Sequence, residues 1–491
     1  MTDVRIDTSA RPDRSRRSGA PGWVLLVASF TAFLGGVNQG TLNVALPVIA
    51  AHFGTGPTVT SWILLSYLVG MAGTILVFGR VADLVGRRRV FLWGMTLFAV
   101  SSVASALAPG VGMVVAGRAV QGVGAAMMFA TGAAMIAAAY PPGRLGSAMG
   151  IFFAVNSVAQ ILGPVLGGVI AAELGWRWLF WVNVPIAVLA YVAGMSVLPR
   201  PEGAGQPRGT FDGPGAALSI VAIVSGVAAL TMGGERGWAS TPIVGLLAAA
   251  AVASAAFVWW ERRAVFPLLD LTLFADKVFR WATISSLLNT AVRFSLILVV
   301  ALMFQTVHAL GPTVAGLAVV PISLGTMLAS LAYGVIERWL GHHRLGVAGS
   351  LVTAAGVVLL IPSVTGSAYL TFTMIGGFVA GVGTGVLLTA NGAAVLLECE
   401  RSMLGVVSSV RALMQMVGNV IGVAGCLVVV AMPLSGGDRS AVYGRSGATL
   451  GPAASDALVR GFHSVFVVLV VVALAGALAS SAARGRPRAR R

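Results

Sequence analysis

The feature that most limits how this chain can fold is a long uncharged run near its N-terminus. Residues 20–79 contain no Lys, Arg, Asp or Glu, and residues 345–397 contain none either. A membrane-spanning helix needs about 20 mostly apolar residues, so each run is long enough for two spans. Only 10% of all residues are charged, against about 25% in an average soluble domain. The sequence therefore predicts an all-α polytopic membrane protein and excludes a soluble enzyme, a secreted disulfide scaffold and a disordered chain.

Fourteen spans are predicted when the rest of the chain is divided in the same way. Charged or Pro/Gly-rich breaks, such as residues 52–57 and 233–236, separate the apolar stretches. Two spans lie in each of the two uncharged runs. The other ten cover approximately residues 90–107, 112–138, 146–170, 177–198, 213–233, 240–260, 281–306, 312–336, 403–432 and 461–483.

The basic residues segregate along the chain in a way that predicts its orientation. With the N-terminus inside, 24 of the 32 Lys and Arg residues fall on cytoplasmic segments, five on outer loops and three within spans. Cytoplasmic loops carry an excess of Lys and Arg, so both termini are expected in the cytoplasm. This bias also explains the net charge of +16, and a nucleic-acid partner is not expected because the arginines do not cluster on one face.

A Pro/Gly-rich stretch at 199–212 suggests how the spans are grouped. It separates two blocks of six spans, with one additional pair inserted between them. We predict a cytoplasmic tail over 1–20, a six-helix bundle over 21–199, a linker and inserted pair over 200–262, a second six-helix bundle over 263–483 and a cytoplasmic tail over 484–491.

The segment after the second span combines glycines, one acid and several arginines. Residues 79–89 read GRVADLVGRRR, and two glycines with six residues between them allow a tight turn where helices approach closely. Asp83 lies among four arginines, which favours a charge-paired latch between helices over a solvated basic loop that only sets topology. The predicted latch residues are Gly79, Arg80, Asp83, Gly86, Arg87 and Arg88.

The predicted fifth span carries a second glycine pattern. Residues 163–168 read GPVLGG. Proline kinks a helix, and glycine removes side-chain bulk so that a neighbouring helix can pack against the backbone. An ordinary glycine-rich packing face explains this spacing as well as a gate does.

Taken together, these patterns resemble the major facilitator superfamily, and within it the branch of fourteen-span drug:proton antiporters. Residues 79–89 are similar to motif A of that superfamily, and residues 118–124 (RAVQGVG) are similar to motif B. Gly150 and residues 163–168 are similar to the antiporter motif C, with Ala159 where a further glycine is usual. Similarity to this branch also extends to NVALP at 43–47 and to GWRWLFWVNVP at 175–185. The resemblance is dense over 38–190 and looser afterwards, where Gly334 and Gly341 repeat the motif A spacing with Arg338 in the place of the acid.

The resemblance implies a fold of two six-helix bundles with a central inserted pair, and it implies roles for particular residues. It assigns proton coupling to the motif B residues Arg118, Gln121 and Gly122. It assigns an outer gate to the motif C residues Gly150, Gly163, Pro164, Gly167 and Gly168.

Three predicted spans contain an arginine: Arg118, Arg293 and Arg411. An arginine at the bilayer centre costs at least about 2.5–3.5 kcal/mol on insertion scales, so it normally faces a bundle interior or a water-filled cavity. Arginine cannot release a proton near neutral pH, so its role is to lower a neighbour's pKa or to hold an anionic group. Arg411 could instead extend to the cytoplasmic interface, and Arg293 could bond a carbonyl on a neighbouring helix.

No Asp or Glu is expected deep within a span. Many relatives in the branch that the chain resembles have an aspartate in the first span at the position of Asn38. Its absence leaves Asp83 and Arg118 as the candidates for proton coupling. A cavity with amides and arginines suits a neutral or anionic amphiphile, because a buried cation without a partner is costly. The candidate cavity residues are Asn38, Gln39, Asn43, Asn289, Arg293, Arg411 and Gln415.

We therefore expect an exporter of small amphiphilic compounds that is driven by the proton gradient and embedded in the lipid bilayer of the cell membrane. A dedicated exporter of one endogenous metabolite, or a receptor of the same fold, is the alternative. No HExxH, GxSxG or GxxxxGK[ST] pattern occurs, which argues against an enzyme and against ATP drive. The five histidines are scattered and the two cysteines, Cys399 and Cys426, are too few for a disulfide framework. No metal, cofactor or obligate protein partner is expected.

Overall fold

A computed structural model of the chain describes residues 21–55, 57–198, 211–399, 403–434 and 452–483. The predicted tails over 1–20 and 484–491, most of the linker, and the centre of the outer loop lie outside the described residues. Every regular element within the described ranges is a helix, which confirms the predicted all-α class.

The first half of the chain forms six long helical segments. They are α1 (Pro21–Phe53), α2 (Pro57–Val85), α3 (Arg87–Ala106), α4 (Val111–Ala139), α5 (Pro142–Glu173), and the short α6 (Trp178–Trp181) continued by α7 (Asn183–Val197). The segment predicted to hold the inserted pair forms α8 (Gly213–Arg236) and α9 (Thr241–Glu261).

The second half follows a short 3₁₀ turn, η1 (Leu271–Ala275). Its elements are α10 (Lys277–Thr306), α11 (Pro312–Leu360), η2 (Ile361–Ser363), α12 (Tyr369–Glu398), α13 (Leu404–Ala431) and α15 (Pro452–Ala482). Thirteen helices in the described ranges are long and apolar enough to cross a membrane. α11 is 49 residues long and breaks at Gly341, so it has the length of two crossings, and the count of fourteen stays a prediction.

Glycine makes two sharp breaks at corresponding places in the two halves. Gly86 separates α2 from α3 with a φ of 100°, and Gly341 interrupts α11 with a φ of 72°. These angles lie in the left-handed region, where a side chain is strained. The two glycines therefore allow the turns that the repeated spacing predicted.

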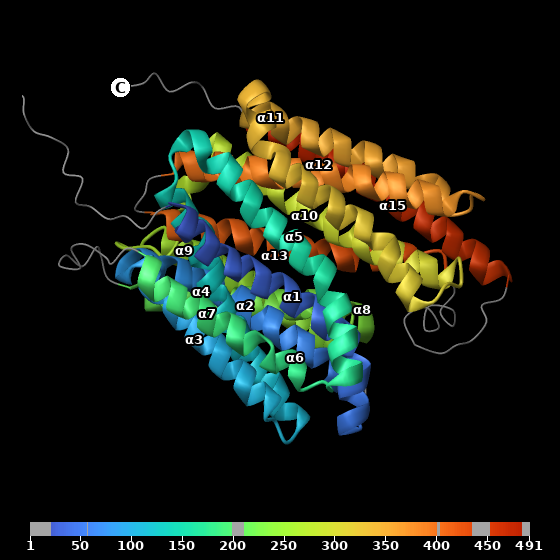
Figure 1. Cartoon of the computed structure of the whole chain (residues 1–491), viewed down its shortest axis with the longest axis horizontal. Helices are drawn as coiled ribbons and strands as arrows, with labels where there is room; N and C mark the ends of the chain where they lie inside the picture. Colours follow the sequence, from blue (N-terminus) through green and yellow to red (C-terminus); the bar gives the residue numbers. More distant parts are fainter. Residues whose placement is uncertain (1–20, 56, 199–210, 400–402, 435–451, 484–491) are drawn as a thin grey trace, which may run out of the picture.

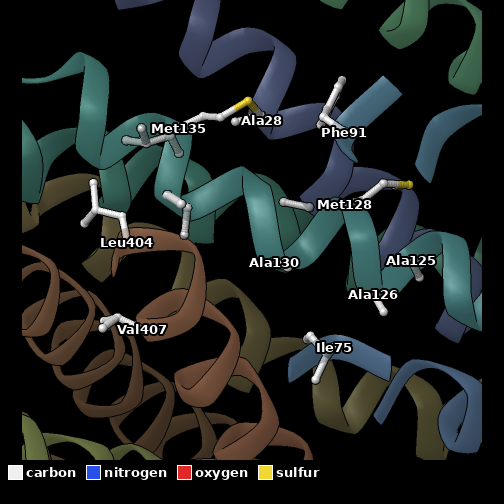
Figure 2. Close-up of a cluster of buried hydrophobic side chains, with 14 of the residues drawn as sticks. Ala28, Ile75, Phe91, Ala125, Ala126, Met128, Ala130, Met135, Leu404 and Val407 are labelled. Atoms are coloured by element: carbon white, nitrogen blue, oxygen red, sulfur yellow. The ribbon is translucent and has the colours of Figure 1, made fainter. Parts of the chain in front are cut away.

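The largest buried apolar cluster draws residues from both halves, and a second large cluster lies within the second half. In Figure 1, α3, α6 and α7 lie on the opposite side of the molecule from α11, α12 and α15, with α5, α10 and α13 between them. Figure 2 shows α4, with Met135 toward the end where Leu404 begins α13, and these two residues belong to the same buried cluster. Helices from both halves thus enclose the region in which a site between the halves can form.

The outer surface of the inserted pair is apolar. The most apolar 18-residue stretch of α9 has a mean hydropathy of 2.1, yet only 11% of that stretch is buried. Val252 and Trp259 are among the exposed side chains of α9. Apolar residues cover exposed surface in this way when the surrounding medium is lipid. α8 packs against α2 and α13, so it joins the pair to both halves.

Candidate functional site

Asp83, near the end of α2, joins the two halves of the protein. Its Oδ1 accepts a hydrogen bond from the backbone N–H of Gly405 at 3.0 Å, and its Oδ2 accepts one from Val406 at 2.9 Å. Arg87 Nη2 donates to Oδ1 at 3.1 Å. The first N–H groups of a helix have no intrahelical acceptor and carry partial positive charge. The predicted latch therefore joins Asp83 chiefly to the N-terminus of α13, a partner that charge patterning could not identify.

Close backbone packing accompanies the latch. A Cβ on Gly79 would lie 2.8 Å from the carbonyl oxygen of Gly405 and closer still to the hydroxyl of Ser409. Any side chain at position 79 would thus push α13 away from Asp83. Arg88 lies on a different interface, because its Nη2 donates to the carbonyl of Met195 on α7 at 2.6 Å.

The second half contains a related contact that the sequence comparison of the halves missed. A Cβ on Gly334 of α11 would lie 2.7 Å from the Cβ of Ser147 on α5, as Gly79 faces Ser409 on α13. The carboxylate of Glu337 contacts Gly146 of α5. Arg338 occupies the place of Asp83 in the repeat, but the residue that meets the partner helix is the acid one position earlier, Glu337.

Arg118 of motif B is buried in a network of hydrogen bonds within the first half. Its Nε donates to the carbonyl of Ile63 at 3.1 Å, and its Nη1 donates to Asn38 Oδ1 at 2.6 Å and to Gln121 Oε1. Gln121 Nε2 donates to the hydroxyl of Ser102 at 2.7 Å. The guanidinium also lies 4.2 Å from the centre of the Tyr67 ring, a cation–π contact. Neutral groups of α1, α2 and α4 thus hold the charge of Arg118, and Ser102 of α3 holds Gln121 in turn.

This network corrects one of the cavity predictions. Asn38 is 1% exposed and accepts from Arg118, and it is not among the residues that line the central cavity. The side-chain amide of Asn38 faces α4, where Arg118 donates to it. Gly122 of motif B lets this packing occur, because a Cβ there would collide with the carbonyl of Tyr67 on α2.

The motif C glycines lie at two different interfaces. A Cβ on Gly163 would lie 2.8 Å from the Cα of Gly40, and one on Gly167 would lie 2.6 Å from the Cα of Thr41, so both pack against α1. Gly150 instead meets the carbonyl of Ser330 on α11, in the other half. The motif C residues thus take part in packing within the first half and between the halves, and the outer gate stays a prediction. Pro164 lies at the same close contact with Gly40 of α1. Gly168, the last residue of the motif, is half-buried.

We expect Gly163→Val to separate α1 from α5 and to destabilise the protein. Overpacking a close contact typically costs about 1–3 kcal/mol. Unfolding in mixed detergent–SDS micelles measures this loss. Gly245→Ala on α9 is the matched control, since a Cβ there meets nothing within 4 Å. Equal stability of the two variants would contradict the packing role.

A cavity lies between the halves, lined by α2, α4 and α5 on one side and α10, α12 and α13 on the other. Its volume is about 110 Å³, smaller than the roughly 300–1,000 Å³ of typical ligand sites, so it must widen to hold a drug-sized compound. Of the predicted cavity residues, the structure brings together Arg293, Arg411 and Gln415.

Asn289 is a second correction to the predicted cavity. It lies one turn before Arg293 on α10, but it faces a narrow space beside Ser350, Thr353 and Leu387 of α11 and α12. Arg293 lines the central cavity, whereas Asn289 does not. The side chains of Gln39 and Asn43 lie outside the described part of the structure.

Sequence reasoning missed two amides and four rings that also line the cavity. Arg293 Nη2 donates to Gln160 Oε1 at 2.7 Å, Gln160 Nε2 donates to Asn156 Oδ1 at 2.6 Å, and Asn156 Nδ2 donates to the carbonyl of Ala32 at 3.0 Å. The spacing of Asn156 and Gln160 on one helical face was a signal that could have revealed them. The rings are Phe129, Phe152, Phe153 and Phe294.

Two buried acids at the base of the inserted pair were also missed. Asp212 and Glu261 are 8% and 5% exposed, and an oxygen of each lies within 2.7 Å of the point where a Cβ on Gly215 would stand. Trp260 Nε1 donates to Asp212 at 2.9 Å, and the backbone of Leu269 donates to Glu261 at 3.2 Å. These bonds join the two ends of the pair to each other and to the segment before α10.

Known proteins resemble this chain over most of its length. The sequence profile of the Major Facilitator Superfamily matches residues 28–423. The chain is 33% identical over 384 residues to the multidrug resistance protein Stp of Mycobacterium tuberculosis, covering 78% of this chain and 71% of the relative. It is 32% identical over 442 residues to the lincomycin resistance protein of Streptomyces lincolnensis, covering 89% of each.

A solved structure agrees with the fold. The human organic anion transporter MFSD10 (TETRAN) aligns with a TM-score of 0.65 over 94% of this chain and 98% of its own, at 14% identity. At that identity the likeness concerns the fold alone. The matched profile covers more than half of the chain, and the relatives of the chain include multidrug and antibiotic resistance proteins. The protein is therefore a multi-pass membrane protein that belongs to the major facilitator superfamily of transporters.

Proposed function

We propose that this protein exports small amphiphilic compounds by alternating access and that the proton gradient drives the export. The observation that carries the proposal is the cavity lined by both halves, with the Asp83 latch at an interface between the same halves. Rocking of one half against the other would open such a cavity to one side at a time. The names of the drug-resistance relatives support export of foreign compounds.

Proton drive is supported by the chemistry of the latch. Arg118 cannot release a proton near neutral pH, whereas the Asp83 carboxylate can bind one. A neutral carboxyl accepts weaker hydrogen bonds than a carboxylate does, so a proton on Asp83 would loosen its bonds to Gly405 and Val406. Proton binding would thus favour separation of α2 from α13.

Transport in everted membrane vesicles tests the proposal. We expect vesicles that contain the protein to accumulate at least one of three fluorescent probes, namely dansylglycine, its neutral amide, and the amine dansylethylenediamine. An uncoupler should then reduce accumulation to the level of vesicles that lack the protein, because the driving gradient is gone. Accumulation that persists with the uncoupler, or the absence of transport for all three probes, would refute the proposed function.

A further inference from the structure

The central cavity carries two positive charges and no negative one. Arg293 and Arg411 are 5% and 3% exposed, and both line the cavity. No Asp or Glu occurs among the described lining residues. Within the described ranges, the ion pair that the structure contains joins Arg87 to Asp83, outside this cavity. The two guanidinium groups therefore lie at the cavity between the halves, and no lining carboxylate balances their charge.

Several hydrogen-bond donors in the cavity have no partner. Arg293 Nε, Arg411 Nε and Nη1, and Gln415 Nε2 are buried without an acceptor. Two of the four lining amides use their oxygens within the cavity, because Gln160 Oε1 accepts from Arg293 and Asn156 Oδ1 accepts from Gln160. The other two amides, Gln415 and Asn419, stand on the same helix as Arg411. The buried guanidinium donors of Arg293 and Arg411 named above therefore meet no acceptor of the chain, and the cavity offers open N–H groups, most of them charged.

Arg118 provides an internal comparison for a structural arginine. It is equally buried, but its Nε and Nη1 have acceptors from Ile63, Asn38 and Gln121. A buried cation that only supports the fold is expected to be bonded in this way, since an unpaired buried charge costs several kcal/mol. The open donors of Arg411 and Arg293 thus indicate a group that is supplied from outside the chain.

Aromatic rings surround these donors. The Arg411 guanidinium lies 5.3 Å from the centre of the Phe153 ring, and Arg293 lies 5.3 Å from that of Phe294. Phe129 and Phe152 line the same cavity. We infer that the cavity selects organic anions with an aromatic body, in which a carboxylate or sulfonate bonds the arginines and the rings hold the apolar part. This inference rests on the proposed function, because it names the substrate class of the same cavity.

Binding of three matched probes to the purified full-length protein in detergent tests this inference. Dansylglycine, dansylglycinamide and dansylethylenediamine share one fluorophore and differ in charge at neutral pH. Their fluorescence on binding reports a Kd for each. We expect dansylglycine to bind at least roughly tenfold more tightly than the other two, because only its carboxylate bonds the open guanidinium donors.

Substitution of each arginine sharpens the test. We expect Arg411→Gln and Arg293→Gln each to weaken dansylglycine binding roughly tenfold or more and to leave dansylglycinamide binding within about twofold. Normal binding of the amide also shows that a variant is folded. Arg411→Lys keeps the charge and should recover part of the affinity for the anion. Arg263→Gln is the matched control, since Arg263 stacks on Trp259 at the exposed end of α9.

The outcomes separate this inference from the proposed function. Tightest binding of the amine, or an equal loss of all three probes in the arginine variants, would overturn anion selection even if the uncoupler stops transport. Preference for dansylglycine with arginine dependence would support anion selection even if transport proved insensitive to the uncoupler. In that second case only the proposed proton drive would fail.

Discussion

Replacement of Asp83 by alanine is expected to release the N-terminus of α13 from α2. The change removes both acceptors of the Gly405 and Val406 amides and the ion pair with Arg87. Hydrogen bonds to a charged group contribute about 1.5–3 kcal/mol each, so the loss of two corresponds to about 3 kcal/mol or more. The population in which these helices are apart should then rise by more than about a hundredfold.

Hydrogen exchange of the first turn of α13 measures this effect directly. The amides of Gly405 and Val406 have no intrahelical acceptor, so their protection depends on Asp83. Their exchange should accelerate by a factor similar to the change in population. Arg87→Gln is the control, because Arg87 is partly exposed and its pairing contributes at most about 1 kcal/mol. If exchange in the Asp83→Ala variant equals that of the unmodified protein, the latch is not formed.

Replacement of Arg118 by alanine should produce the largest loss of stability. It leaves Asn38, Gln121 and the carbonyl of Ile63 without their donor in a fully buried site. Each buried polar group that is left without a partner costs about 1–3 kcal/mol, so three such groups correspond to roughly 3 kcal/mol or more. Unfolding in mixed detergent–SDS micelles should show this decrease, and uncoupler-sensitive transport should be lost.

A double-mutant cycle with Asn38 separates the network from general disruption. Asn38→Ala removes one acceptor and leaves Arg118 its bonds to Ile63 and Gln121. The double variant should therefore lose less stability than the sum of the two single variants, because contacting residues are not additive. Additive losses would mean that Arg118 and Asn38 do not interact.

Much of the architecture could be predicted from local sequence alone. Long uncharged runs require helices in a bilayer, because each backbone group must then be bonded within its own segment. The glycines at 86 and 341 marked both breaks, since positive φ angles favour residues without a side chain. The spacing around Asp83 favoured a contact between helices but left the partner unknown, and in the structure that partner is the start of α13.

The contents of the cavity were harder to predict. Helical spacing tells which residues share a face of one helix. It does not tell which neighbouring helix each residue meets, because several helices surround a face in a bundle. Asn289 and Arg293 share a face by spacing and nevertheless meet different neighbours. Asn38 was expected to line the cavity and instead bonds Arg118, while Gln160 was not considered and bonds Arg293. These pairings join residues that are 80 and 133 positions apart, so no local pattern contains them.

The amino-acid sequence by itself determined that this protein is a helical membrane protein with three arginines inside its predicted spans, because apolar length and the cost of a charge in lipid are properties of each segment. Only the tertiary structure decided what each arginine does. Arg118 meets acceptors on its own half, whereas Arg293 and Arg411 keep donors open in the space between the halves. The difference depends on which residues from distant parts of the chain lie beside each arginine, and only the folded structure brings those residues together.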